Sequence, residues 1–254
     1  LATRQEAYKR TAQEIFIYVL RDMTDSEGGF FSAEDADSEG VEGKFYLWKK
    51  EEIDKSLNKE EAELASQIWS LTAQGNFREE ASGQPTGANI PHLKKSLATW
   101  AKEMNTTAEA LQEKLAPIRQ KLFSIRKQRV PPGKDDKILT DWNGLMIAAL
   151  AKGAQAFAEP QYAEAAARAA NFILTKLRRG DGELLHRYRA NEAAVLAHAS
   201  DYAFFIWGLL ELYETTFEVH YLKTALELNR IFIRHFWDHE NGGFFFTSDH
   251  GEKL

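Results

Sequence analysis

Five carboxylates fall within nine positions near the start of the chain: Glu34, Asp35, Asp37, Glu39 and Glu42. Two carboxylates at a suitable separation can act as general acid and general base on a glycosidic bond. We therefore predict that Asp35, Asp37 and Glu39 are catalytic. The ordinary alternative, that Asp35 or Asp37 caps a backbone turn, stays open.

Aromatic rings follow these acids, among them Tyr46 and Trp48. Flat apolar rings beside carboxylates are typical of a wall that binds a polar small molecule such as a sugar. We predict that Glu34, Glu42, Tyr46 and Trp48 bind substrate. The ligand is expected to be a polyhydroxylated molecule that is neutral or cationic, because an acidic loop with only Lys44 close by repels anions.

A second group of residues stands at the expected starts of two later helices. Trp142 and Asn143 suit ring stacking and hydroxyl recognition, and Asp201 and Tyr202 occupy the corresponding place farther along the chain. All four are predicted to bind substrate. Asp141 and Asp201 are also plausible N-caps, which is the commoner role of an aspartate at a helix start.

Metal and cofactor sites are not expected. The seven histidines form no His-x-x-x-His or His-Glu-x-x-His pattern, and the acidic stretch lacks the alternating aspartates of a calcium loop. No glycine-rich phosphate loop follows an expected strand.

Composition excludes several classes of function. The 254 residues carry a formal net charge of −6 and no basic stripe, so neither nucleic acid nor a membrane surface is an expected partner. There is no cysteine, and no apolar run approaches the ~20 residues of a membrane span. We expect a cytoplasmic protein, and we interpret the chain, which begins at Leu1, as a piece of a longer one.

A repeat of about 60 residues organises the second half of the chain. Asp141 aligns with Asp201, Leu150 with Leu210, and Gly182 with Gly242. Each unit reads as a helix, a short turn, a second helix, a glycine-rich turn and a short strand. We predict antiparallel helical hairpins from 141–157 with 161–178 and from 201–217 with 219–237.

The two helices of each hairpin differ in polarity. Residues 201–213 are apolar at nearly every position, which predicts a helix buried on all sides. Residues 219–237 carry one apolar stripe, as an outer amphipathic helix does. Inner and outer helices in alternation predict an all-α fold, an (α/α) toroid of helical hairpins with short β-hairpins at its loop ends. A solenoid of helix pairs is the alternative.

The region at about 38–105 is less regular and is expected to be an excursion from a single partial toroid domain covering 1–254. It is predicted to hold a strand at 44–48, short helices near 50–57, 60–70 and 94–103, and a loop near 72–93. A capping box, Thr106-x-x-Glu109, predicts where the next helix begins.

Several motifs carry a family resemblance over nearly the whole chain: Gly28–Trp48, Gly75-Asn76-Phe77, 135–144, Asp201-Tyr202-Ala203 and Gly242-Gly243-Phe244-Phe245. They resemble the YyaL-like, thioredoxin-domain-containing proteins, whose animal members are called spermatogenesis-associated. The resemblance implies an N-terminal thioredoxin-like domain, a partner outside this chain, followed by a six-hairpin toroid of which the chain is a middle part. One departure is Ser200, where the family usually has an acid.

The toroid of that family is similar to those of N-acylglucosamine 2-epimerases and many glycoside hydrolases. Epimerases of this general fold use histidine as base, so the resemblance implies a catalytic role for His198 and makes His186 a second candidate. Two hypotheses stay open. The first is a carbohydrate-active enzyme, either a hydrolase or an epimerase. The second is a non-catalytic toroid that binds a ligand or a protein and works with the thioredoxin-like domain.

Overall fold

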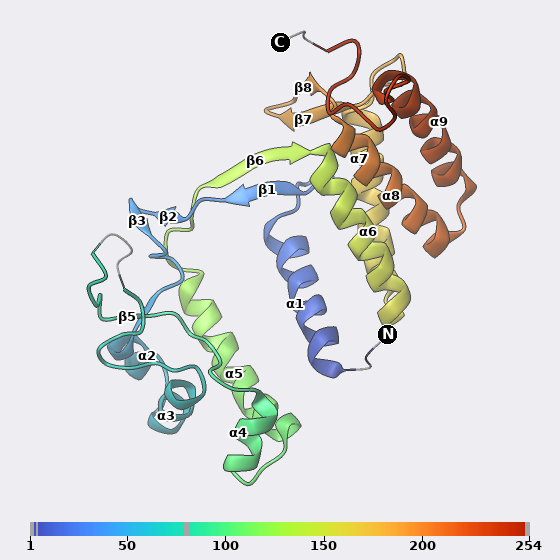
Figure 1. Cartoon of the computed structure of the whole chain (residues 1–254). Coiled ribbons are helices and arrows are strands. Elements are labelled where there is room, and N and C mark those ends of the chain that lie inside the picture. Colours follow the sequence, from blue (N-terminus) through green and yellow to red (C-terminus); the bar gives the residue numbers. More distant parts are fainter. Residues whose placement is uncertain (1–2, 4, 79–81, 252–254) are drawn as a thin grey trace. The chain divides into compact units, whose positions relative to one another are not determined.

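The chain forms two compact units. The computed structural model describes residue 3 and residues 5–78 and 82–251. Unit 1 comprises Leu1–Ala33 and Lys134–Leu254, and unit 2 comprises Glu34–Gly133 (Figure 1). Among the described helices, none combines the length and the apolarity needed to cross a membrane.

Unit 1 is built from helices and one small sheet. Its elements in chain order are α1 (Glu6–Asp22), β1 (Phe31–Glu34, whose last residue begins unit 2), β6 (Lys134–Leu139), α6 (Thr140–Phe157), α7 (Pro160–Lys176), β7 (Leu185–Arg189), β8 (Glu192–Leu196), α8 (Ala199–Thr216) and α9 (Val219–Phe236). The four-stranded sheet has the order β1-β6-β7-β8, and β7 pairs antiparallel with both β6 and β8.

The helical hairpins predicted from the repeat are confirmed. Helix α7 packs on α6, helix α9 packs on α8, and α6 lies against α8. Glycine permits this last approach, because a Cβ atom at Gly144 would lie 2.5 Å from the backbone of Phe204. Residues one repeat apart also meet, since the Gln155 Nε2 donates to the Thr215 Oγ1 at 2.7 Å.

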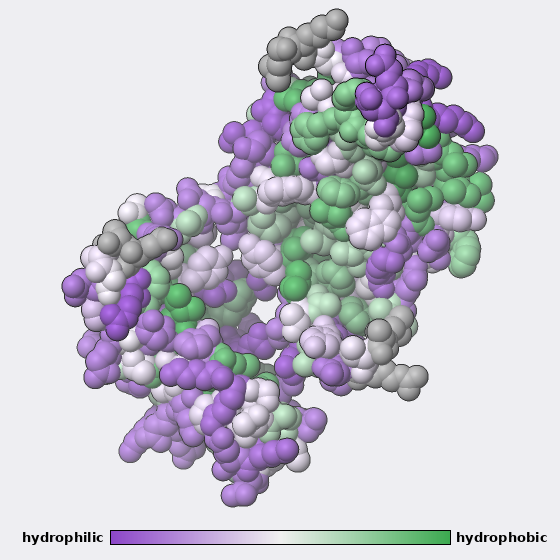
Figure 2. Space-filling model, in the orientation of Figure 1, coloured by the Kyte–Doolittle hydropathy of each residue, from purple (hydrophilic) through white to green (hydrophobic). Residues whose placement is uncertain are grey.

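The prediction that α8 is buried on all sides is wrong on one face. Phe205 and Leu209 are fully buried, but Trp207 is 43% exposed and Leu210 is 37% exposed. Trp142 on α6 is also exposed. Figure 2 shows hydrophobic surface over the α6–α9 helices. The apolar pattern of these helices therefore exceeds what this chain buries.

Helix α1 joins the core of unit 1 through aromatic packing. The ring of Phe16 lies 4.9 Å from that of Tyr162 between centroids, and a Cβ atom at Gly153 would lie 2.4 Å from Phe16. The core continues through the inner faces of both hairpins.

Unit 2 contains short strands and four helices in its described residues: β2 (Asp37–Ser38), β3 (Val41–Glu42), β4 (Trp48–Lys49), α2 (Lys50–Ser56), α3 (Lys59–Ile68), β5 (Ala88–Asn89), α4 (Leu97–Glu103) and α5 (Ala108–Arg126). The excursion predicted at 38–105 lies within this unit. Its three short helices are present as α2, α3 and α4.

Two local predictions for unit 2 are wrong. The strand expected at 44–48 is a turn through residue 46, stabilised by Gly43, whose φ is +67° and whose carbonyl accepts from the Tyr46 N–H; strand β4 begins only at Trp48. Helix α5 is capped by Thr107 instead of Thr106, since the Thr107 Oγ1 accepts from the Ala110 N–H at 3.1 Å.

A fully buried asparagine ties unit 2 together. The Asn89 side chain accepts from the Thr72 N–H at 2.9 Å and donates to the carbonyls of Thr72 and Trp48. One side chain thus holds the loop after α3 against strand β4.

Candidate functional site

Asp201 lies at the centre of a polar cluster in unit 1. Its side chain is fully buried and sits in the first turn of α8. One oxygen accepts from the Asp141 N–H at 2.9 Å, and the other accepts from the His198 N–H at 2.7 Å. The second bond is half of a capping box in which His198 is the N-cap and Asp201 is the third residue of the helix. The prediction that Asp201 is the N-cap is therefore wrong, as is the one for Asp141, because Leu139 is the N-cap of α6.

Two imidazoles complete this cluster. The His186 Nδ1 lies 3.0 Å from both oxygens of Asp201, and the His198 Nδ1 lies 3.5 Å from one of them. The rings of His186 and His198 meet edge to face at 4.9 Å, and Phe246 stacks on His198 at 4.7 Å. Both histidine side chains keep about a quarter of their surface exposed.

This environment shifts two pKa values upward. The hydrogen bond to Asp201 is the main cause that raises the pKa of His186, and the nearby charges add to it. Burial, followed by the charge of Asp201, raises the pKa of Asp141. The cluster therefore holds an imidazole that binds its proton more tightly than usual beside a carboxyl group that releases its proton late.

Other predicted binding residues near this cluster are engaged by the backbone. Asn143 is fully buried, where it accepts from the Phe30 N–H at 2.8 Å and donates to the carbonyls of Phe30 and Leu139. The Tyr202 hydroxyl accepts from the Leu184 N–H at 3.0 Å, and burial raises its pKa to about 12. Both side chains fasten segments of unit 1 together. The Trp142 side chain, by contrast, is half exposed.

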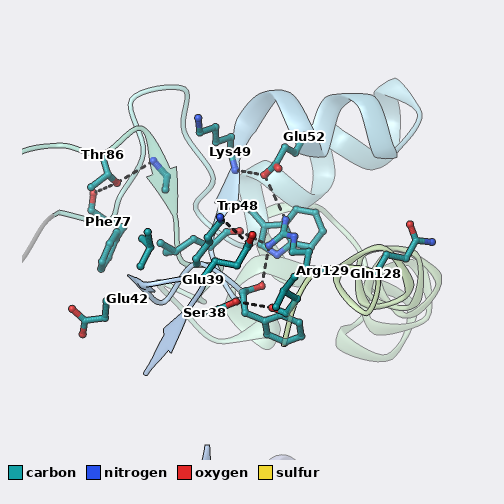
Figure 3. Close-up of a pocket in the computed structure, with 16 residues that line it drawn as sticks. Ser38, Glu39, Glu42, Trp48, Lys49, Glu52, Phe77, Thr86, Gln128 and Arg129 are labelled. Carbon is teal, nitrogen blue, oxygen red and sulfur yellow. Dashed lines mark hydrogen bonds and ion pairs between the residues drawn. The ribbon is translucent and has the colours of Figure 1, made fainter. Parts of the chain in front are cut away.

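Unit 2 contains a separate pocket with a volume of about 620 Å³ (Figure 3). Three of the residues predicted to form a site line this pocket: Glu39 and Glu42 from the acidic stretch, and Trp48 from the aromatic residues that follow it. Glu52 and Arg129 lie beside them, from α2 and from the segment after α5. Its volume is within the range of small-molecule sites, which is roughly 300–1,000 Å³.

Arg129 organises the wall of this pocket. Its guanidinium lies over the Trp48 ring at 4.1 Å, donates to the carbonyls of Phe45 and Leu47, and approaches Glu52 at 3.5 Å. Burial lowers the pKa of Arg129, which nevertheless remains a cation at neutral pH. The prediction of an anion-repelling loop counted Lys44 alone, and the fold adds Arg129 and Lys49 to the lining.

Three acids of the stretch, Glu34, Asp35 and Glu39, have partners close by in the sequence. Asp35 caps a turn by accepting from the Asp37 N–H at 3.1 Å, which was the ordinary alternative for this residue. The Tyr46 hydroxyl donates to Glu34 at 2.9 Å, and Lys44 pairs with Glu39 at 2.8 Å. Asp37 and Glu42 are exposed members of the paired strands β2 and β3.

The predicted residues thus fall into two groups. His198, Asp201, Tyr202, Trp142 and Asn143 belong to unit 1, whereas the residues between 34 and 48 belong to unit 2. The catalytic and binding assignments of these residues stay predictions.

Sequence reasoning gave too little weight to two residues, Asp141 and Arg129. The repeat carried a signal for Asp141, since it aligns with Asp201 and its backbone proves to contact that residue. Nothing in the sequence pattern distinguished Arg129 from a surface cation, because its partners are carbonyls distant along the chain.

No protein-family model matches the chain. Curated relatives do match it over most of its length. Human spermatogenesis-associated protein 20 is 30% identical over 94% of this chain, which spans 34% of the human protein. An uncharacterized protein of Caenorhabditis elegans is 32% identical over 97% of this chain, which spans 36% of that protein.

Solved structures of sugar-acting proteins resemble the fold loosely. A D-mannose isomerase is 14% identical, with 97% of this chain and 75% of that chain covered and a TM-score of 0.41. A cellobiose 2-epimerase from Bacillus thermoamylovorans is 10% identical, with 92% and 56% covered and a TM-score of 0.40. Nothing about the reaction follows from TM-scores this low.

The sequence relatives are therefore more informative than the structural ones, and they agree with the motifs found along the chain. Over most of its length the chain is homologous to spermatogenesis-associated protein 20, and it corresponds to about a third of that longer protein.

Proposed function

We propose that this chain supplies part of a carbohydrate-active (α/α) toroid domain in which His186 transfers a proton at a carbon atom of a sugar. The observation that carries the proposal is the fully buried Asp201, whose carboxylate holds His186 at 3.0 Å. A carboxylate in this position fixes the orientation of an imidazole and stabilises its protonated form.

The chemistry that suits this arrangement is epimerisation or isomerisation. Asp201 engages the Nδ1 of His186, so the Nε2 is the nitrogen that would remove a proton from the carbon beside the carbonyl of an open-chain sugar. The enediol that forms regains a proton on the other face or on the neighbouring carbon. Asp141, whose pKa is raised, suits the donation of a proton to the carbonyl oxygen.

Glycoside hydrolysis receives less support from this cluster. It needs two carboxyl groups on either side of a bond, about 5–5.5 Å or 6.5–9.5 Å apart. Asp201 is fully buried and already accepts from two backbone N–H groups. It is therefore suited to orient His186 and unsuited to touch a substrate.

A ring of further hairpins is part of this proposal. The repeat supplies two hairpins whose inner helices lie side by side, and their exposed apolar residues, such as Trp142 and Trp207, are suited to face other hairpins or a ligand. The longer relatives leave room for these hairpins and for a thioredoxin-like domain.

Proton exchange tests the enzyme proposal. We would incubate the full-length protein with a panel of aldoses and ketoses in D₂O and follow the carbon beside the carbonyl by NMR. We expect deuterium incorporation that falls by about 10²–10⁴-fold in His186→Gln. The matched control is His220→Gln, an exposed histidine of α9. Exchange that is absent, or equal in both variants, contradicts the proposal.

The pocket of unit 2 favours a second candidate, a non-catalytic binding function. Two of its acids are paired with cations, Glu39 with Lys44 and Glu52 with Arg129, which suits recognition better than proton transfer. Calorimetry with the same sugars should show binding that weakens in Glu42→Gln, a lining variant, and not in Glu51→Gln. Equal affinities in the two variants would exclude this pocket.

A further inference from the structure

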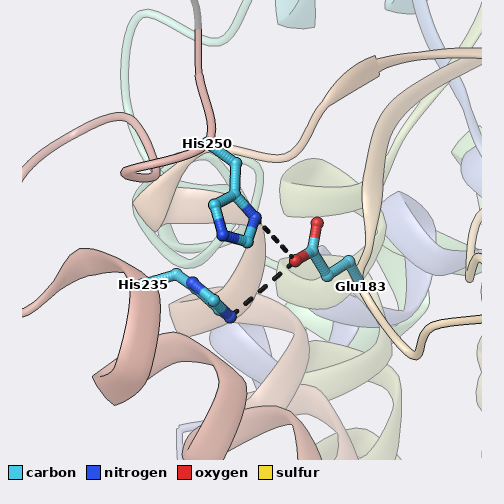
Figure 4. A group of neighbouring side chains, drawn as sticks. All are labelled: Glu183, His235 and His250. Carbon is cyan, nitrogen blue, oxygen red and sulfur yellow. Dashed lines mark ion pairs between the residues drawn. The ribbon is translucent and has the colours of Figure 1, made fainter.

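Three side chains from distant segments of unit 1 converge away from the Asp201 cluster. They are Glu183 from the turn before β7, His235 from the last turn of α9, and His250 from the loop that follows α9 (Figure 4). Figure 4 shows both imidazoles directed at one carboxylate oxygen of Glu183. Their ligand atoms all lie within 4.8 Å of one another.

The distances suit a single shared ion. The Glu183 Oε1 lies 3.3 Å from the His250 Nδ1 and 3.8 Å from the His235 Nε2. Ligand atoms about 2.0–2.1 Å from a tetrahedral metal are about 3.3–3.4 Å from one another. The pair of Glu183 and His250 already has this separation, and the other ligand atoms lie within 4.8 Å of one another.

The surroundings hold the ligands in place. Asp249 contacts the other ring nitrogen of His235, with its Oδ1 2.8 Å from the Nδ1. A carboxylate behind a histidine in this way fixes the tautomer that presents Nε2 to a metal. Arg179 lies 3.6 Å from the second oxygen of Glu183, which leaves Oε1 directed at the histidines.

The backbone is also fixed on each side of the cluster. The Arg179 N–H donates to the Glu183 carbonyl at 2.8 Å, and Gly182 supplies the positive φ, +92°, that this turn requires. The Asp249 N–H donates to the His235 carbonyl at 3.0 Å. The side chains of Glu183 and His235 are mostly buried, at 16% and 13% exposed, so an ion there is partly shielded from water.

We propose that Glu183, His235 and His250 bind a divalent transition-metal ion, with Zn²⁺ as the expected occupant and Asp249 as the positioning residue behind His235. Two imidazoles and one carboxylate favour zinc and its neighbours over Ca²⁺ or Mg²⁺, which prefer oxygen ligands. Three protein ligands also leave a fourth position for water.

The Asp201 cluster is the weaker metal site. It also brings together two histidines and a carboxylate, but both oxygens of Asp201 already accept from backbone N–H groups. No metal was expected from the sequence, because its histidines form no ligand pattern on a single helix. The ligands proposed here come from three segments, 52 and 15 residues apart along the chain (235 − 183 and 250 − 235).

Metal binding would restrict the motion of the loop after α9, because His250 on that loop would share the ion with Glu183 and His235. Phe246 of this loop stacks on His198, and its carbonyl accepts from the Ala199 N–H at 2.9 Å. An ion held by His250 would therefore steady one wall of the Asp201 cluster. The proposal does not require that cluster to be catalytic.

Metal titration of the full-length protein tests the proposal. The protein would be stripped with a chelator, dialysed, and titrated with Zn²⁺ by calorimetry and with Co²⁺ by visible absorption. We expect one ion whose affinity falls at least about 100-fold in His250→Ala and in His235→Ala, and by about 10–100-fold in Asp249→Asn. The cobalt spectrum of His250→Ala should change, because one nitrogen ligand is replaced by water.

Two control variants separate this site from others in the longer protein. His220→Ala removes an exposed histidine from the same helix as His235, and His186→Gln removes a histidine of the Asp201 cluster. Neither should change the affinity. His250 is exposed, so its variant is expected to fold, and hydrogen exchange of unit 1 checks this. Zinc binding that is absent, or that is unchanged in His235→Ala and His250→Ala, overturns the proposal.

Discussion

The two units of this chain hold their polar side chains in different ways. In unit 1 a fully buried carboxylate, Asp201, is surrounded by N–H donors that fix it in one position. In unit 2 the acidic residues lie mostly on exposed turns and short strands, where they pair with nearby cations such as Lys44. Unit 1 therefore has a cluster of polar side chains fixed in position. Unit 2 has a pocket whose rim carries acidic and basic side chains exposed to solvent.

This difference shows that the density of acids along a sequence is a poor guide to their chemistry. Five carboxylates lie between residues 34 and 42, yet the raised pKa values of the polar cluster belong to Asp141 and His186, and its buried hydrogen bonds belong to Asp201. Burial and fixed donors suit a carboxylate to orient a neighbouring imidazole and raise its pKa, and both depend on the fold.

The contrast between the two units is tested most directly by a substitution at Asp201. Asp201→Ala should lower the free energy of unfolding of unit 1 by about 3–5 kcal/mol, because His186 and two backbone N–H groups lose a buried acceptor. Denaturant unfolding measures this loss. The control is Asp37→Ala in unit 2, an exposed residue, with an expected change within about 0.5 kcal/mol. Equal effects would erase the contrast between the units.

Among the described residues each unit has one fully buried asparagine, so the two units can be tested with the same substitution. Asn143→Ala and Asn89→Ala each remove an acceptor and two donors from buried backbone groups, for about 2–3 kcal/mol. Hydrogen exchange read by mass spectrometry should show faster exchange in unit 1 for the first variant and in unit 2 for the second. The exposed Asn171 gives a control, as Asn171→Ala. Faster exchange in both units with either variant would mean that they unfold together.

A smaller effect is expected from pH at the Asp201 cluster of unit 1. The folded state raises the pKa of His186, chiefly through the hydrogen bond to Asp201, so it favours the protonated ring. The resulting stabilisation is complete below the unfolded pKa, about 6.5, and is lost as the pH rises through the higher folded value. The raised pKa of Asp141 acts in the same direction, because its deprotonation is disfavoured in the folded state.

The measurement is the free energy of unfolding of unit 1 across this pH range. We expect it to decline with rising pH in the wild type, with a smaller slope in His186→Gln. A slope that is unchanged by the substitution would show that His186 is not the group responsible.

The smallest expected effect concerns the rim of the pocket in unit 2. Glu39→Gln breaks the ion pair with Lys44, in which each side chain is nearly half exposed. Exposed pairs contribute at most about 1 kcal/mol and weaken in salt. Urea unfolding at low and high salt should therefore differ little between this variant and the wild type. A larger loss at low salt would show that the rim is more rigid than its exposure indicates.

The spacing of apolar residues was sufficient to predict the helical hairpins but not how much of each helix surface is buried. The 60-residue repeat placed α6 to α9 within a few residues, because polarity at a spacing of three and four residues follows directly from helix geometry. It could not predict that Trp207 and Leu210 stay exposed, since that depends on what packs against them.

The candidate site was predictable only where the sequence itself carried a spacing. Asp201 was found because it stands at an expected helix start, and the repeat linked Asp141 to it, whereas His198 came from the family resemblance. The partners of Arg129, and the convergence of Glu183 with His235 and His250, come from tertiary folding of distant segments. Contacts between segments that are distant along the chain cannot be predicted from local sequence patterns.

The order of strands in the sheet of unit 1 also bears on how this protein could evolve. Strand β1 leads out of that sheet and β6, its neighbour, leads back in, so the whole of unit 2 is an insertion between two adjacent strands. The ends of the insertion meet, since the Asp35 N–H donates to the Gly133 carbonyl at 2.7 Å. Closing a loop depends only weakly on its length. Lineages could therefore shorten, enlarge or exchange this inserted segment without remaking the helical hairpins around Asp201.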